Sequence, residues 1–323
     1  MVHTRCYQGG VLTEKDFPVE QVSEHLELPG ATVWVDLCVP DQSDLELLAD
    51  ELQLHALALE DATVGRQRPK LDHYDTHLFL TVYQVRIDPP TGQLLTAEVA
   101  AFVTRNALVT VRRTPDFAID ELIRRWDADS GLAGKGVPFL LHGLLDFVVD
   151  SHFAAVQSLD DEIERLEDLV FDDHPRNAEV QRRSFALRKS LLQLRRVVMP
   201  MREVLNALLR GDLHLVDEAT APYLHDVYDH VLRVTEWADS LRDLVATILE
   251  TNLTIQGNRL NTIMKQVTSW AAIIAVPTAV TGFYGQNVAF PGFGDTAGFW
   301  LSTALMVGLS GALYLSFRRR DWL

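Results

Sequence analysis

The fold is decided by two apolar stretches, VTSWAAIIAVPTAVTGFY at residues 267–284 and FWLSTALMVGLSGALYLSF at residues 299–317. Each is 18 or 19 residues long, which is about the length of a helix that crosses a hydrocarbon core of roughly 30 Å. No Asp, Glu, Lys, Arg or His lies between Gln266 and Gly294, so neither stretch places a charge in lipid. The sequence therefore predicts two membrane spans joined by a short loop.

The flanking charges predict the orientation of these spans. Arg259 and Lys265 precede the first span and Arg318–Arg320 follow the second, whereas the loop carries only Asp295. Basic residues concentrate on the cytoplasmic side of membrane proteins. The first ten residues, MVHTRCYQGG, lack the apolar run of a signal peptide. We therefore expect a multi-pass protein of the cytoplasmic membrane with both termini in the cytoplasm.

The composition of the 323-residue chain narrows the function. The 29 basic and 45 acidic residues give a formal charge of −16, which argues against nucleic acid and for cations as partners. Cys6 and Cys38 form no CxxC pair, so neither a disulfide framework nor a thiolate metal site is indicated. The G-x-S-x-G, H-E-x-x-H and P-loop motifs are all missing from the sequence, and we do not expect an enzyme.

The hydrophobic period changes along the chain. Short β-branched or aromatic runs at 32–35, 78–83 and 107–111 alternate with helical segments such as 44–51, and residues 88–92 read as a hairpin turn. Helical patterns dominate from about Val137 onward. The predicted organisation is a cytoplasmic α/β domain (1–136), long cytoplasmic helices (137–216), a stalk helix continuing into the first span (217–284, with the span at about 266–284), an outer loop (285–298), a second span (299–317) and a basic cytoplasmic tail (318–323).

Two further features of the helical region are an acidic segment and an internal proline. The acidic segment LDDEIERLEDLVFDD, residues 159–173, is either a solvated helix face or a device that concentrates divalent cations. Pro200 lies inside a helical pattern and should kink or interrupt it.

The helix that enters the membrane presents two seams at a spacing of three and four residues. We call the first the bulky seam, because it consists mainly of large apolar residues: Leu253, Gln256, Leu260, Ile263, Val267, Trp270, Ile274 and Pro277. We call the second the small-residue seam, because it is small or polar at nearly every position: Glu250, Thr254, Gly257, Asn261, Met264, Thr268, Ala271, Ala275, Thr278, Gly282 and Gly285.

A small-residue seam in a membrane helix indicates either close helix packing or the wall of a pore. Glu250, Thr254 and Asn261 continue the polar run below the membrane, where close packing would favour Ala or Leu. This favours the pore wall. Since two helices cannot enclose a pore, several copies of the chain would have to assemble.

The stretch NRLNTIMKQVTSWAAIIAVPTAVTGFYGQN, residues 258–287, followed by a second span and a basic end, resembles the CorA-type divalent-cation transporters. Their Tyr-Gly-Met-Asn signature stands here as Tyr284-Gly285-Gln286-Asn287, with Gln286 in place of Met. The resemblance also covers Asp226–His230, Leu59–Asp61 and Arg66–Lys70.

The resemblance implies a homopentamer whose first spans line a central pore. Gly285, Gln286 and Asn287 would form the selectivity filter, and Met264 with Val267 the apolar gate. Mg²⁺ releases its water reluctantly, so we expect it to pass largely hydrated, with Co²⁺ as a second substrate. The family pattern also implies regulation by intracellular Mg²⁺, bound between Asp61, with Glu60 beside it, and Asp226 of a neighbouring chain. Ordinary surface carboxylates are the alternative at these positions.

Two other functions fit the same residues. One is a Zn²⁺ transporter of the same architecture, perhaps coupled to protons, since Gln286 departs from the signature and His225 and His230 lie near Asp226. The other is a membrane-anchored cation sensor that conducts nothing.

Overall fold

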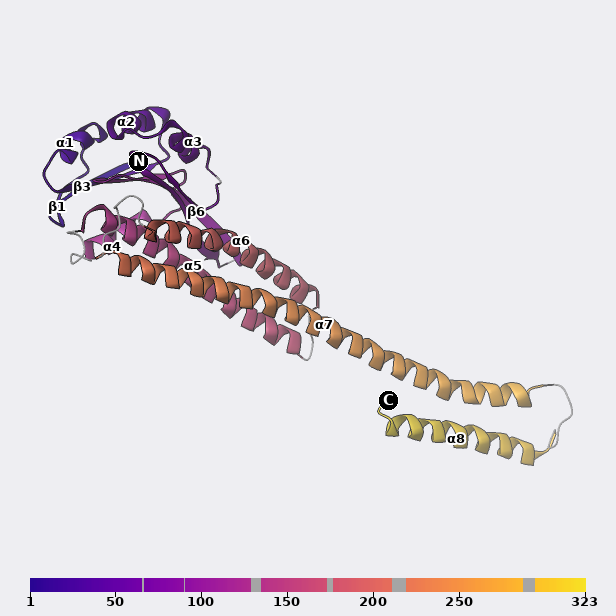
Figure 1. The fold of residues 1–323 in the computed structure, drawn as a ribbon. Coiled ribbons are helices and arrows are strands. Elements are labelled where there is room, and N and C mark those ends of the chain that lie inside the picture. Colours follow the sequence, from indigo (N-terminus) through magenta and orange to yellow (C-terminus); the bar gives the residue numbers. More distant parts are fainter. Residues whose placement is uncertain (66, 90, 129–134, 173–176, 211–218, 287–293) are drawn as a thin grey trace. The chain divides into compact units, whose positions relative to one another are not determined.

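The computed structural model describes residues 1–65, 67–89, 91–128, 135–172, 177–210, 219–286 and 294–323. The chain divides into two compact units, Met1–Thr247 and Ile248–Leu323. Figure 1 shows the elements of both units, which are described separately below.

The first unit is built on a seven-stranded sheet with the order β2-β1-β3-β7-β6-β5-β4. Neighbouring strands are antiparallel except for β3 and β7, which pair in parallel at the centre. The strands are β1 (Val2–Gln8), β2 (Val11–Lys15), β3 (Ala31–Cys38), β4 (Lys70–His73), β5 (Leu78–Asp88), β6 (Gln93–Val103) and β7 (Ala107–Arg112). The three predicted β runs lie within β3, β5 and β7, and the predicted hairpin turn joins β5 to β6.

Short helices cover one face of the sheet and longer helices cover the other (Figure 1). The first group comprises a 3₁₀ turn at Val19–Gln21, α1 (Val22–Leu26), α2 (Gln42–Leu52) and α3 (Ala56–Val64). They form one apolar core with the sheet, which includes Leu48 of α2, Ala58 of α3 and buried side chains of β3 and β7. On the opposite face, α4 (Ile119–Ala128) places Trp126 edge-on to Trp34 of β3, with ring centroids 5.0 Å apart.

The long helices of this unit are α5 (Val137–Phe171), α6 (Asn177–Leu209) and the first part of α7 (Ala221–Tyr284). Gly143 of α5 lies against Trp126, because a Cβ there would approach the indole Nε1 to 2.3 Å. Pro200 does not interrupt α6, which is helical on both sides of it. The proline therefore costs one backbone hydrogen bond without ending the helix.

Four contacts fix the relative directions of α5, α6 and α7. The rings of His142 and Tyr223 are 5.6 Å apart, and those of Phe153 and Trp237 are 5.4 Å apart. From the first pair to the second, the residue number increases in both helices, so α5 and α7 are parallel. Contacts of α6 with α7 run the opposite way, from Arg195–Asp239 (3.0 Å) to Asn206–Tyr228 (3.4 Å), so α6 is antiparallel to both neighbours.

The second unit contains the rest of α7 and the helix α8 (Thr296–Arg319). Along α7, serine and threonine hydroxyls donate hydrogen bonds to the backbone carbonyl one turn earlier, as Thr268 does to the Met264 carbonyl (2.7 Å). Such bonds satisfy polar side chains within the helix itself. This matters in lipid, which offers no hydrogen-bonding partner.

A buried ion pair lies on the two central strands of the sheet. Arg112 Nη2 is 2.6 Å from Asp36 Oδ2, and both side chains are almost completely buried. Arg112 Nε also donates to this carboxylate, at 3.0 Å from Oδ1, and Thr110 Oγ1 donates a further hydrogen bond to Asp36 at 2.8 Å. Because the carboxylate is shielded from water, its charge depends on these partners.

Replacing Arg112 with Met should therefore destabilise the protein by about 3–5 kcal/mol, the usual cost of leaving one member of a buried pair uncompensated. Thermal unfolding in detergent, followed by tryptophan fluorescence, would measure the loss. Arg105→Met, at an exposed turn position, is the matched control and should change little. Equal effects of the two substitutions would contradict the importance assigned to the pair.

Candidate functional site

Within the part of the chain that the structure describes, three helices are long and apolar enough to cross a membrane by length and composition: α5, α7 and α8. Burial separates them, because 61% of the apolar window of α5 is buried, against 6% for α7 and 11% for α8. The apolar residues of α5 pack against the sheet, as Val148 and Val156 do with full burial. Only α7 and α8 leave their apolar surfaces uncovered.

The small-residue seam lies along one exposed line of α7. All of its members from Glu250 to Gly282 are helical and exposed. The bulky seam is also largely uncovered, with Leu260 64% and Ile274 63% exposed. A single copy of the chain therefore covers neither seam.

A third face of α7 is the one that its own chain covers within the second unit. Ser269 is fully buried, and Ala272, Ile273, Val276 and Val280 are partly buried at helical spacing. These positions belong to neither seam. The two seams are therefore among the surfaces of α7 that remain available to other copies of the chain.

The threonines of the small-residue seam present oxygen lone pairs outward. Thr254, Thr268 and Thr278 each donate their hydroxyl hydrogen to the carbonyl four residues earlier, at 2.7–3.1 Å. The hydroxyl oxygen keeps its acceptor sites. The seam thus offers acceptors without carrying a charge between Thr254 and Gly285.

The predicted filter lies partly outside the described residues. Asn287 is not described, whereas Gly285 and Gln286 end the helix in a turn and are exposed. Gly285 donates its N–H to Thr281 O at 2.8 Å. A Cβ at Gly285 would lie 2.9 Å from that same carbonyl oxygen, so this position excludes any side chain.

The predicted regulatory carboxylates differ in environment. Asp226 is exposed, with 67% of its side chain accessible, and Glu60 is also exposed. Asp61 is partly buried at the end of α3 and accepts a hydrogen bond from Lys70 Nζ at 2.5 Å. That bond, with a second from Gln67, lowers the pKa of Asp61 below its ordinary value. Asp61 is therefore a paired carboxylate, whereas the sequence suggested a free one.

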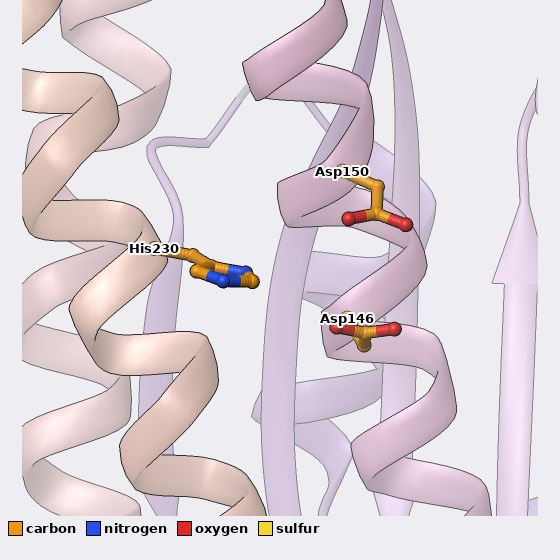
Figure 2. Close-up of side chains that lie close together, drawn as sticks. All are labelled: Asp146, Asp150 and His230. Carbon is orange, nitrogen blue, oxygen red and sulfur yellow. The ribbon is translucent and has the colours of Figure 1, made fainter.

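A further cluster joins α5 to α7 (Figure 2). Asp146 and Asp150 lie one turn apart on α5 and face His230 of α7. One ligand atom from each lies within 4.8 Å of the others, and all three residues are partly buried. Carboxylate oxygens suit Mg²⁺, and an added imidazole suits transition metals such as Co²⁺ or Zn²⁺.

The positive guanidinium of Arg125 lies close to the two negative carboxylates of this cluster. Burial, and next the neighbouring Asp150 carboxylate, raise the pKa of Asp146. Arg125 Nη1 lies 2.5 Å from Asp150 Oδ2 and 3.9 Å from Asp146 Oδ2. A divalent cation at this position would therefore compete with Arg125.

Sequence reasoning placed His230 near Asp226 and missed Asp146 and Asp150. The structure confirms the first proximity, with His230 Nε2 3.9 Å from Asp226 Oδ2. The sequence signal for the missed pair is two carboxylates four residues apart in the mainly apolar first half of α5. Their partner comes from a helix about 80 residues later, which spacing alone does not reveal.

The family follows from comparison with known proteins. The sequence model of the CorA-like Mg²⁺ transporter proteins matches residues 29–319. The chain belongs to this family. It is therefore a divalent-cation transporter and not an enzyme, as the sequence predicted.

Individual CorA relatives cover most of the chain. The cobalt/magnesium transport protein CorA of Thermotoga maritima is 28% identical over 90% of this chain and 83% of its own. The zinc transport protein ZntB of Yersinia pseudotuberculosis is 24% identical over 82% of this chain and 80% of its own. The complete CorA magnesium transporter structure from Methanocaldococcus jannaschii has a TM-score of 0.83, with 23% identity over 99% of this chain and 98% of its own, which confirms the fold.

Replacing Lys70 with Met should strengthen divalent-cation binding near Asp61, because it removes the cation that now occupies the carboxylate. The rise of the thermal midpoint on adding Mg²⁺ should then occur at lower Mg²⁺ concentration. Asp72→Asn removes the other carboxylate bonded to Lys70 (2.6 Å) and leaves Asp61 paired, so it serves as control. An unchanged Mg²⁺ response in Lys70→Met would show that Asp61 does not take part in binding.

Proposed function

We propose that the protein is a homopentameric channel that mediates uptake of hydrated Mg²⁺, and also Co²⁺, across the cytoplasmic membrane. The observation that carries this proposal is the small-residue seam of α7, an exposed line of acceptors that the chain itself leaves uncovered. The membership of the chain in a transporter family supports it. Five copies would place the small-residue seams around a central pore and the bulky seams between neighbours.

The chemistry of the seam favours a hydrated ion. Waters bound to Mg²⁺ direct their hydrogens outward, and the outward oxygens of Thr268 and Thr278 are placed to accept them. Neutral hydroxyls cannot replace the inner shell of an ion that dehydrates reluctantly. We assign Asn287 the same role at the pore mouth, with Gly285 allowing the tight turn beneath it.

Met264 and Val267 form the proposed gate. Their side chains are 64% and 61% exposed, and both lie on the cytoplasmic side of the first span. Rings of apolar side chains block ions by excluding water from a narrow passage. In the closed state the Met264 side chains of the small-residue seam would meet at the pore axis, and Val267 of the bulky seam would pack beside them between neighbouring chains.

The proposed orientation places both termini in the cytoplasm. Arg318 and Arg319 end α8, and the loop between the spans carries only Asp295. Positive charge therefore lies at one end of the helix pair. The long polar part of the chain would then form a cytoplasmic domain.

Flux into liposomes tests the transport proposal. Purified protein should conduct Mg²⁺ and Co²⁺ down the membrane potential, and Asn287→Ala should abolish selective uptake. Asn258→Ala removes an amide outside both seams of α7 and should leave uptake intact. A pentamer that conducts none of Mg²⁺, Co²⁺ and Zn²⁺ would contradict the proposal, and Zn²⁺ uptake that requires a pH gradient would favour the zinc alternative.

Regulation is proposed to act through Asp61 and Asp226 of neighbouring chains, with Glu60 beside them. Intracellular Mg²⁺ between the carboxylates would offset their repulsion and hold the closed state. The pairing of Asp61 with Lys70 makes this site weaker than two free carboxylates. Asp226 also adjoins the cluster of Asp146, Asp150 and His230, which supports cation sensing in this region.

Replacing the proposed regulatory carboxylates with neutral amides should reduce the inhibition of transport by internal Mg²⁺. The double variant Asp61→Asn/Asp226→Asn should remain conductive at internal Mg²⁺ concentrations that inhibit the wild type. Liposomes loaded with graded Mg²⁺ provide the measurement, and Asp229→Asn, an exposed position of α7, is the control. Intact inhibition in the double variant would reject this assignment.

A further inference from the structure

The outward face of α6 carries a line of exposed apolar side chains. Phe185, Leu192 and Met199 are 76%, 41% and 50% exposed and follow one another at intervals of seven residues, or about two helical turns. We call them the α6 stripe. Water-exposed side chains of this size on one line indicate a surface that another element covers.

Basic residues flank the α6 stripe on both sides. The exposed positions of this face include five basic residues: Arg182, Arg188, Lys189, Arg196 and Arg202. In a chain with a formal charge of −16, this concentration is unusual. The surface that covers the α6 stripe should therefore be acidic with an apolar centre.

The same chain offers such a surface between α5 and α7. Phe153 and Trp237 meet there edge to face, and Phe153 is 38% exposed. The face of α5 that carries Asp146, Asp150 and Phe153 continues at helical spacing through four residues: Gln157, Asp160, Glu164 and Asp168. Exposed carboxylates on α7 beside it are Glu236 and Asp243. We call this surface the acidic groove.

The α6 stripe and the acidic groove are separate surfaces of one helical bundle. The inner side of α6 contacts α7 through Arg195 and Asp239, whereas the α6 stripe points outward. A contact between two different surfaces of identical chains is head-to-tail and closes into a ring when its rotation allows.

The register of the helices matches charges across such a contact. One cleft of 840 Å³ is lined by Glu162 and Arg165 of α5 and by Arg183 and Leu187 of α6, so these residues lie at one level of the bundle. In a ring whose axis is parallel to the helices, a given residue lies at the same height along the axis in every copy. Lys189 of one copy then meets the level of Asp160 in the next.

The same register places Arg196 at the level of Phe153 and Trp237. Leu192 and Met199 lie about one turn to either side of Arg196. A guanidinium over aromatic rings, with apolar side chains next to it, is a favourable arrangement.

We propose that the α6 stripe of each protomer packs into the acidic groove of the next protomer, forming a cytoplasmic contact of the ring. The inference rests on the proposed function in that several copies surround one axis. It assigns the acidic segment of residues 159–173 a role in assembly.

Cysteine cross-linking of the full-length protein in membranes tests this contact. Leu192→Cys and Gln157→Cys lie at one level, and the native Cys6 and Cys38 are buried, so background oxidation is low. Oxidation of the double variant should give a ladder of covalent oligomers that neither single variant gives. Leu192→Cys with Phe171→Cys is the matched control, because residue 171 is about 21 Å further along α5. Equal ladders from both pairs, or none from the first, would overturn the inference.

A charge exchange provides a second test. Lys189→Glu and Asp160→Lys should each lower the pentamer fraction in native mass spectrometry at low salt, and the combination should restore it. A combined loss larger than either single loss would reject the pairing. A wild-type pentamer without the cross-link contradicts this contact alone, whereas a wild-type monomer contradicts the proposed function as well.

Discussion

A membrane helix must satisfy its polar groups without water, and this constraint governs how α7 is used. Its hydroxyls bond to its own backbone, which makes the helix tolerable in lipid, as the Thr268 to Met264 bond shows. Yet the small-residue seam remains uncovered, and one neighbouring helix shields only the Ser269 face. This uncovered seam is the observation on which the proposed assembly of several copies rests.

The first unit packs the beginning of α7 against α5 and α6. The parallel pair of β3 and β7 carries the buried Asp36–Arg112 bond, and α5 packs along the sheet while also contacting α7. Charged groups concentrate where α5 meets α7, at Asp146, Asp150 and His230 (Figure 2). A cation bound there would contact both α5 and α7, and it would favour whichever arrangement of the two helices binds it more tightly.

The sequence was informative where periodicity alone determines structure. Two uncharged stretches predicted α7 and α8, and β-branched runs predicted the central strands. The side-chain pairs could not be predicted from the sequence. Lys70, which pairs with Asp61, lies on β4, the strand that follows α3. Asp146 approaches His230 only when the long helices α5, α6 and α7 pack together. At Pro200 the sequence predicted a kink or an interruption. The helix α6 is not interrupted there, because the cost of the proline is local and Val197, Val198 and Met201 on either side of it are buried.

The hydroxyl geometry of α7 bears on the sign of the ions that the proposed pore would pass. Water around an anion turns its hydrogens inward and presents oxygens to its surroundings, so it would seek donors from the wall. Thr254, Thr268 and Thr278 have already given their hydrogens to the backbone. In the proposed pore such a lining would disfavour chloride through hydrogen-bond polarity alone, and it would do so at high ionic strength, where electrostatic exclusion is screened.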